Sequence, residues 1–467
     1  MHILAFFICL GVNSYINSSD KGLLKIVYAN MLFFDILIIG RGIIMARKSK
    51  KLETIINMID IEEKIEEEEL EKLDFDKEFI LTLQSNANLL SDKRDSCYSY
   101  HSIESVLLLV IFGIMANCNT FVRIYLFMLK HQEWLQKHIM FDFGLPSLST
   151  IKRVIGMINT KELETIFNES LSTFIDIEKP YYKDNDIEIK DLKSMDGKTA
   201  NSSDRKASKN GEISKTNAMS LYSVKNDRTE ATEFIEDKTN EIPTGIDLLK
   251  RVNIDGSIVV FDAMSTQTKT IDYIASHGAY YVAPVKGNQS NLEEDIKQYF
   301  DDKELYRAAK EKSYYETIEK SHGGETRKYI FTDDINWLYK KEEWKDIKSI
   351  GLAERTYVNK NGEIVTDTRY YISNINYKKI ELLSKAIRGE WTIENGLHLY
   401  LDMVFLEDEN KCFLDNSQKN LNIIRKFCLA LLKRYKIKTK LSMDSVRFNI
   451  SMDFENEIEK VITDVLF

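Results

Sequence analysis

Proline is scarce in this chain, with four residues among 467, whereas apolar residues are abundant. Hydrophobic residues make up 43% of the sequence and charged residues 29%. Disordered proteins typically combine low hydrophobicity with many prolines, so global disorder is excluded. The length suggests two or three domains.

Cysteine is also sparse, and its spacing excludes two kinds of site. The sequence contains no C-x-x-C pair, and its five cysteines are Cys9, Cys97, Cys118, Cys412 and Cys428. An odd, scattered set argues against a disulfide framework and against a zinc cluster. A reducing compartment fits best.

Apolar runs long enough to cross a bilayer are missing. "ILAFFICLGV" and "MLFFDILIIGRGIIMA" lie near the start, but Asp35 and Arg41 interrupt the second. The run at 106–116 is too short for a bilayer and predicts a buried core helix. Two interpretations of residues 1–45 stay open: a signal or membrane hairpin, or sequence upstream of a true start at Met45.

A phosphate-binding loop is absent too, although "MDGKTAN" (195–201) contains Gly-Lys-Thr. A Walker loop needs a glycine five positions before that triplet, and this position is Leu192. Nucleotide binding at this stretch is therefore excluded. The residue of interest becomes Asp196.

The net charge of −9 does not exclude a nucleic-acid partner, because it is unevenly distributed. Residues 60–78 hold eleven acidic residues against three lysines, which leaves the remainder near neutrality. Basic clusters then stand out at 47–51, 205–209 and 433–440. Such patches are electrostatic candidates for binding DNA or RNA.

The first half of the chain has a helical pattern. Residues 50–85 read as a charged helix or arm, and about 88–175 as helical throughout. Within "GLPSLSTIKRVIGMIN" (144–159), Ser147 or Ser149 can cap a helix that carries Lys152 and Arg153 near its start. A helix-turn-helix that reads DNA has this pattern, and so does an ordinary helix corner.

After residue 185 short strands alternate with helices, which predicts an α/β domain. "SIVVFDA" (257–263) reads as a buried strand that ends at Asp262. A β-rich interval at 312–376 contains Asn361-Gly362, a strong hairpin signal. Two helices follow, in "LLSKAIRGEWTIENGLHLYLDMVF" and "NLNIIRKFCLALLKRYK".

Three acids stand where apolar packing does not favour them: Asp196, Asp262 and Glu394. A buried carboxylate must be hydrogen-bonded, paired or bound to a metal. Glu394, His398 and Asp402 are spaced i, i+4, i+8 on one helical stripe, so His398 and Asp402 are candidates to support a metal ligand. A solvated polar face explains the same spacing.

Several motifs resemble those of the H-repeat-associated insertion-sequence transposases, a family of DDE transposases. In order they are "DGKT" (196), "KTNEIP" (238), "IVVFDAMSTQ" (258), "YVAPVKGNQSNLEEDI" (281), "HGGETR" (322), "YYISNI" (370) and "WTIENGLHLYLDMVFLEDE" (391). The stretches "SDKRD" (91) and "GLPSLSTIKRV" (144) are similar to the domain that precedes the catalytic one. The resemblance covers roughly residues 75–436.

The resemblance implies an α/β fold: a ribonuclease-H-like catalytic domain with a β-rich insertion before the last catalytic helix, preceded by an all-α domain. Asp196 on the first strand, Asp262 after the fourth and Glu394 on a helix would be the catalytic, metal-binding acids. Where the family usually has His-Trp this chain has Glu390-Trp391, where it has Trp this chain has Leu399, and where it has Arg this chain has Lys411.

The chemistry expected of such a triad is two-metal phosphoryl transfer. Three carboxylates suit two Mg²⁺ (or Mn²⁺) ions better than zinc, because hard ions prefer oxygen. The expected function is cleavage of DNA at element ends and joining of the 3′-hydroxyl to target DNA; the alternative is a catalytically impaired, transposase-derived DNA-binding protein. The candidates for DNA contacts are Lys198, Arg205, Lys206, Lys286, Asn288, Lys152 and Arg153.

The expected partners are transposon ends and target DNA, bound by a homodimer or higher oligomer, with no small-molecule cofactor. We expect a cytoplasmic protein acting on bacterial DNA, with membrane association through residues 1–45 left open. The predicted divisions are a hydrophobic extension (1–45), a charged helical arm (46–85), a helical domain that is a candidate for DNA-end binding (86–180), the first part of the catalytic core (186–310), the β-rich insertion (311–378), the catalytic and closing helices (379–436) and a tail (437–467).

Overall fold

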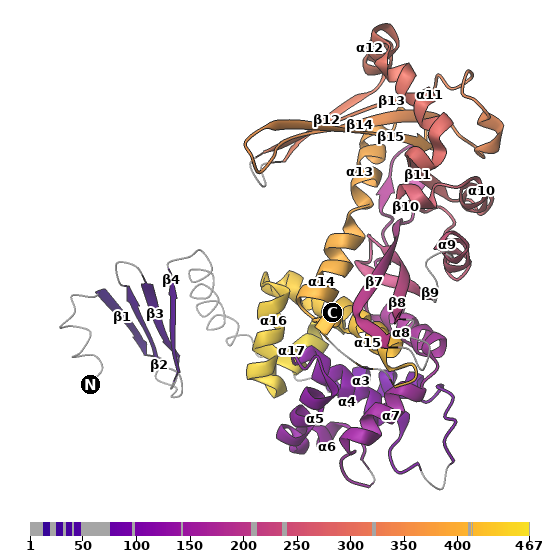
Figure 1. Ribbon diagram of the computed structural model, residues 1–467. Coiled ribbons are helices and arrows are strands. Elements are labelled where there is room, and N and C mark those ends of the chain that lie inside the picture. Colours follow the sequence, from indigo (N-terminus) through magenta and orange to yellow (C-terminus); the bar gives the residue numbers. More distant parts are fainter. Residues whose placement is uncertain are drawn as a thin grey trace. The chain divides into compact units, whose positions relative to one another are not determined.

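The computed structural model describes residues 75–95, 99–141, 143–206, 213–235, 241–319, 324–409, 412 and 414–466, and the backbone of four strands before residue 48 (Figure 1). The chain falls into two compact units, residues 1–73 and 74–467. Among the residues described, no helix has both the length and the apolar character that a membrane crossing requires.

The first unit contains a four-stranded antiparallel sheet in the order β1-β2-β3-β4. Its strands are β1 (Asn13–Ser18), β2 (Lys25–Asn30), β3 (Phe34–Ile39) and β4 (Gly42–Arg47). Strands β3 and β4 cover part of the second apolar run of the hydrophobic extension, whereas the first run, "ILAFFICLGV", lies outside the described residues. Most of the predicted charged arm lies outside the described residues.

The second unit begins with a group of helices. They are α3 (Phe75–Ala87), α4 (Ile103–Met115), α5 (Phe121–Lys130), α6 (Gln132–His138), α7 (Leu148–Met157) and α8 (Thr160–Ile175). Helix α4 is buried along almost its whole length, which confirms a core helix at 106–116. The Ser147 side chain caps α7 by accepting a hydrogen bond from the Thr150 amide, as predicted.

A long helix, α15 (Ser417–Thr439), packs against both the helical group and the sheet. It contacts α4, α7 and α8 on the one hand and β9 (Arg228–Ile235) on the other. From α15, the buried ammonium group of Lys426 donates to the hydroxyls of Ser220 (2.9 Å) and Thr232 (2.8 Å) in the sheet. Residues after 440, predicted as a tail, form α16 (Met443–Met452) and α17 (Phe454–Leu466), which pack on α15.

A nine-stranded mixed sheet forms the centre of the second unit, in the order β12-β13-β14-β15-β11-β10-β7-β8-β9. Strands β7, β10 and β11 are parallel neighbours, and the remaining pairings are antiparallel. The strands are β7 (Leu192–Lys206), β8 (Ile213–Ser223), β9 (Arg228–Ile235), β10 (Ile258–Phe261), β11 (Tyr280–Val285), β12 (Tyr314–Glu319), β13 (Glu325–Thr332), β14 (Ser349–Val358) and β15 (Ile364–Ser373). A separate two-stranded ribbon, β5 (Tyr182–Lys183) and β6 (Glu188–Ile189), precedes them.

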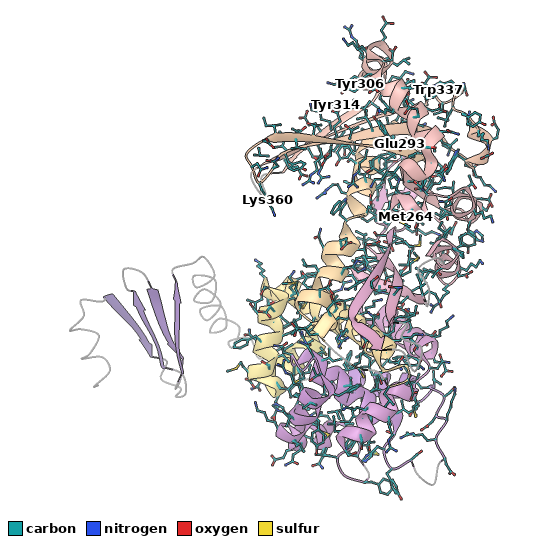
Figure 2. All side chains as sticks on the ribbon, in the orientation of Figure 1. Met264, Glu293, Tyr306, Tyr314, Trp337 and Lys360 are labelled. Carbon is teal, nitrogen blue, oxygen red and sulfur yellow. The ribbon has the colours of Figure 1, made fainter. Side chains whose placement is uncertain are left out.

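The β-rich interval does not form a separate layer, because β15 pairs directly with β11 and thereby extends the core sheet. The hairpin predicted at Asn361-Gly362 joins β14 to β15 and is confirmed. Its loop is five residues long, between Val358 and Ile364, and Gly362 adopts a positive φ of 82°. Lys360 marks the tip of this hairpin in Figure 2.

Helices cover both faces of the sheet and bury a separate core under each. On one face lie α9 (Glu241–Leu249), α10 (Thr268–Ser276), α11 (Ser290–Asp301) and α12 (Lys303–Lys312), and on the other lies α13 (Ile380–Gly389). In β10, Val259 and Phe261 belong to the first core, whereas Ile258 and Val260 belong to the core under α13. This alternation explains why "IVVF" is apolar throughout.

Candidate active site

Asp196 lies in β7 beside the end of β10. The two strands are parallel, and Met195 is aligned with Phe261. Leu192 of β7 belongs to the core under α13 and Met195 to the opposite core, so alternation turns Asp196 toward the α13 face. The hydroxyl of Ser194, two residues earlier on that face, donates to the carbonyl of Glu390 at 3.1 Å. Residues just after α13 therefore lie above Asp196.

Glu394 and His398 come from the segment that follows α13. This segment forms a π-helical turn, Glu394–His398, and continues as α14 (Leu399–Met403). The Nδ1 atom of His398 lies 3.5 Å from Asp196 Oδ2 and 3.5 Å from Glu394 Oε2. Candidate ligand atoms of Asp196, Glu394 and His398 all lie within 4.8 Å of one another. Side chains from distant parts of the chain thus meet in one small group.

Asp262 lies next to this group but is not one of its members. It is exposed, directly follows β10, and caps a short 3₁₀ turn (η3, Ala263–Ser265) by accepting a hydrogen bond from the Ser265 amide at 3.2 Å. Its charge nevertheless acts on Asp196. The structure therefore brings two of the three predicted acids together and leaves the third at the neighbouring strand end. Met264 of η3 is labelled in Figure 2.

Charge in this region is crowded. Burial raises the pKa of Asp196 to about 6, and Glu394 and Asp262 repel its negative charge, while His398 and the Gly197 amide oppose the rise. The interaction with His398 lowers the pKa of Glu394. An added cation would favour the ionised form of both carboxylates.

Glu390 contributes a further carboxyl group close to the acids. Burial raises its pKa to about 7; Asp262 and Asp196 add repulsion, while Arg369 opposes the rise. The guanidinium of Arg369 lies 3.9 Å from its carboxylate. The departure noted at Glu390-Trp391 therefore places an acid beside the candidate site.

Asp402, the other candidate to support a metal ligand, pairs with Lys198. The Lys198 ammonium group donates to Asp402, and 11% of the Lys198 side chain is exposed. The π-helical turn holds more residues per turn than an α-helix, so the regular i, i+4, i+8 stripe is not kept. Lys198, predicted to contact DNA phosphate, is engaged in this ion pair.

Two loops at the strand ends are tied together. Asn288, exposed in the turn η4 (Gly287–Gln289), donates through Nδ2 to the Ala263 carbonyl at 2.7 Å. Gln289 donates through Nε2 to the Thr266 carbonyl at 3.0 Å. Lys286 is exposed in the same loop, and its charge acts on Glu390. These bonds place the predicted phosphate contacts Lys286 and Asn288 beside the Asp262 loop.

The remaining DNA-contact candidates are not part of this group. Lys152 is half-buried and Arg153 exposed on α7, which packs against α4, α5 and α15. Arg205 and Lys206 end β7, but their side chains lie outside the described residues. His398 was assigned only a supporting role, although it lies between the two carboxylates. Its i+4 spacing from Glu394 was the available signal.

Comparison with known proteins identifies the family. Residues 185–431 match the family described as "Transposase DDE domain", and residues 88–170 match the family "DDE_Tnp_1-associated". The former match spans more than half of the chain.

Relatives of known sequence agree with this match. The "Putative protein YbfL" of Escherichia coli is 30% identical over 360 residues, which is 76% of this chain and 91% of that protein. The "H repeat-associated putative transposase YhhI" of Escherichia coli is 29% identical over 360 residues, with the same coverage.

A solved structure of a piggyBac transposase synaptic complex with hairpin DNA matches 85% of this chain and 83% of its own. Its identity is 12% and its TM-score 0.35, values too low to bear on the fold. The matching family and the two relatives decide the question. The chain belongs to the DDE transposase family, in the group of the H repeat-associated transposases.

Proposed function

We propose that the protein cuts DNA at the ends of an insertion sequence and joins the freed 3′-hydroxyl to target DNA. The observation that carries this proposal is the meeting of Asp196 and Glu394 at His398, with Asp262 at the end of the adjacent parallel strand. Clustered carboxylates from separate elements are what divalent-ion phosphoryl transfer requires. Membership of a transposase family supplies the substrate, DNA.

The strand order supports a ribonuclease-H-like core. Within the nine-stranded sheet, β7 is the first strand along the chain and β10 the fourth, and the order β9-β8-β7-β10-β11 places them side by side. We propose that residues 186–310 and 379–436 form this core, that 311–378 is its β-rich insertion, and that 86–180 forms the domain in front of it.

The donor set fits Mg²⁺ or Mn²⁺. Asp196, Asp262 and Glu394 would hold two ions, since carboxylate oxygens are the ligands that these hard cations prefer. The raised pKa of Asp196 supports the fit, because a bound cation would offset both the burial of this carboxylate and its repulsion by Glu394 and Asp262. Such ions activate the attacking oxygen and stabilise the leaving oxygen of a phosphodiester.

The protein's own groups position the reactants. His398, buried and 3.5 Å from both carboxylates, fixes the orientation of Asp196 and Glu394. Lys286 and Asn288 are exposed beside Asp262 and would contact DNA phosphates. Lys152 and Arg153 of α7 are proposed to act at the element end, and Arg205 and Lys206 at the backbone. Because two ends must be joined, a dimer or higher oligomer on DNA is expected.

A second candidate function is DNA binding without cleavage. Glu390 favours it, because this position usually holds histidine in the family and here adds a carboxyl group beside the acids. An impaired enzyme of this kind would still occupy DNA. A gel-shift assay run beside the cleavage assay separates the two functions.

The decisive experiment is Asp262→Asn, assayed for Mg²⁺-dependent cleavage of DNA that carries the element ends. We expect cleavage to fall by at least about 100-fold, since a metal site that stabilises transition-state charge contributes several kcal/mol. The matched control is Asp272→Asn, an exposed acid on α10 with a side chain 63% exposed. Undiminished cutting by a folded Asp262→Asn protein overturns the assignment.

A further inference from the structure

A hollow of about 620 Å³ lies beside the Glu394 segment, between that segment and the end of α15. Its lining includes Arg388 from the end of α13, Trp391 and Asn395 from the segment, and Lys436 and Lys440 from the end of α15. The α15 residues belong to the basic cluster 433–440, to which the proposed function assigns no role. The hollow therefore joins that cluster to the catalytic segment.

The charge of this hollow is mainly positive. Its lining contains four basic side chains, Arg388, Lys433, Lys436 and Lys440, and a single carboxylate, Asp227. Asp227 is already paired, because it lies 2.8 Å from the Lys433 ammonium group and also accepts from Tyr222. Lys436 and Lys440 add further positive charge to the lining, which suits an anionic ligand.

The Glu394 segment packs closely against Tyr222 and Lys433 at the position of Gly396. A Cβ atom added at Gly396 would lie 2.8 Å from the Tyr222 hydroxyl and 3.5 Å from the Lys433 ammonium group. Glu394 is two residues before Gly396. The hollow and the proposed site of strand cleavage therefore share one short helical segment, each on a different face of it.

Trp391 adds an aromatic surface to the hollow. The residue is 42% exposed, and the Arg369 guanidinium lies 5.6 Å from its ring centre. Trp391, Arg388 and Asn395 also line a second hollow of about 130 Å³, which extends toward the arginines of β13, β14 and β15. Exposed aromatics between cationic groups form the platforms on which single-stranded nucleic acids stack their bases.

We propose that this hollow binds the backbone of one DNA strand next to the cleavage site, with an unpaired base on Trp391. The proposal rests on the proposed function and adds to it a strand-holding site on the C-terminal part of α15. Lys436 and Lys440 contact phosphates, and Trp391 stacks on the base. The contacts are independent of sequence, as backbone and stacking contacts are.

Lys436 and Lys440 also lie at the C-terminal end of α15, where a positive charge interacts favourably with the negative end of the helix dipole. This role is structural and would affect stability without affecting DNA. The Lys436 ammonium group donates to the Tyr400 hydroxyl at 2.8 Å, which is another structural contact. Thermal stability and DNA affinity must therefore be measured together.

The test uses the full chain carrying Asp262→Asn, in EDTA, so that binding is read without cleavage. Fluorescein-labelled DNA with a single-stranded overhang is titrated at several salt concentrations, beside a blunt duplex and an RNA strand. For Lys436→Gln with Lys440→Gln we expect weaker binding and a log–log salt slope shallower by about one to two, the value for two lost phosphate contacts. The control is Lys297→Gln with Lys303→Gln, exposed lysines that line neither hollow.

Trp391→Ala should weaken binding of the overhang by about 5- to 100-fold, while Trp391→Phe keeps most of the affinity. The blunt duplex should be affected far less. Unchanged affinity and salt slope in variants of unchanged melting temperature overturn the site. Tighter binding of the RNA strand than of the DNA overhang overturns the assignment to DNA. If the protein binds in this way but wild type does not cut, the cleavage proposal fails and the strand-holding site stands.

Discussion

Two adjoining regions of the molecule carry opposite charge, and residues 388–400 contribute to both. Four acids, Asp196, Asp262, Glu390 and Glu394, gather where β7 passes the end of β10, and burial together with their mutual repulsion raises the pKa of Asp196 and of Glu390. The hollow at the end of α15 collects arginine and lysine instead. The contrast suggests a division of work, in which the acidic region holds cations for the chemistry and the basic region holds the DNA.

The largest expected effect is on the acidic region alone. Removing divalent ions with EDTA should abolish cleavage and leave DNA binding in place. Mg²⁺ should also raise the melting temperature of the free protein, since a ligand at 100 times its Kd stabilises by about 2.7 kcal/mol. Glu394→Gln should lose this shift, whereas Asp272→Asn should keep it. Equal shifts in both variants would contradict a metal site at Glu394.

A smaller effect is expected where the two regions meet. In Gly396→Ala the new methyl group would lie 2.8 Å from the Tyr222 hydroxyl, so the Glu394 segment or the buried tyrosine must move. We expect the free energy of unfolding to fall by about 1–3 kcal/mol, as for other overpacked sites, and cleavage to fall with it. Gly287→Ala is the stability control, because nothing lies within 4 Å of its added Cβ atom. Equal stability of the two variants would show that the segment is not held there.

The smallest effect concerns Glu390 and depends on pH. Its pKa is raised from 4.5 to about 7 in the folded protein, chiefly by burial. Below pH 4.5 the Glu390 carboxyl is protonated in both the folded and the unfolded state, so its burial does not lower the free energy of unfolding through charge. Between pH 4.5 and 7 the unfolded state loses this proton while the folded state keeps it, so stability falls over that range; above pH 7 the folded state holds the buried charge and the loss is complete.

Glu390→Gln should therefore stabilise the metal-free protein at pH 8 by roughly 1–3 kcal/mol and have little effect at pH 4.5. Denaturant unfolding at the two pH values measures the difference. A gain of the same size at both would mean that its charge is not the cause.

Local patterns in the sequence predicted much of the fold. The apolar run "IVVF" gave β10, Asn361-Gly362 gave the β14–β15 hairpin, and Ser147 gave the cap of α7. Each depends on neighbouring residues only, through burial, turn chemistry or a cap. The pairing of β15 with β11 joins residues far apart in the chain, and no local pattern encodes it.

The site was predictable in part for the same reason. Asp262 stood out as a carboxylate after the apolar run "IVVF", whereas Asp196 was found through the Gly-Lys-Thr that follows it, and the family resemblance pointed to both. Their closeness follows from the register of β7 and β10, which the sequence does not display. The partnership of Asp402 with Lys198 was missed, because helical periodicity assumes a regular helix through residue 402. The basic hollow was missed because α15 and the segment 388–400 meet only in three dimensions.

The π-helical turn at Glu394–His398 determines the directions in which the side chains of α14 point. One residue advances an α-helix by about 100°, so a one-residue deletion that restored regular winding would swing α14 around its axis by that angle. Leu401, now 1% exposed, would leave the interior, and Lys198 would lose Asp402. The π-helical turn thus lets one helical segment place His398 beside Asp196 and Glu394 while Leu401, further along, stays buried.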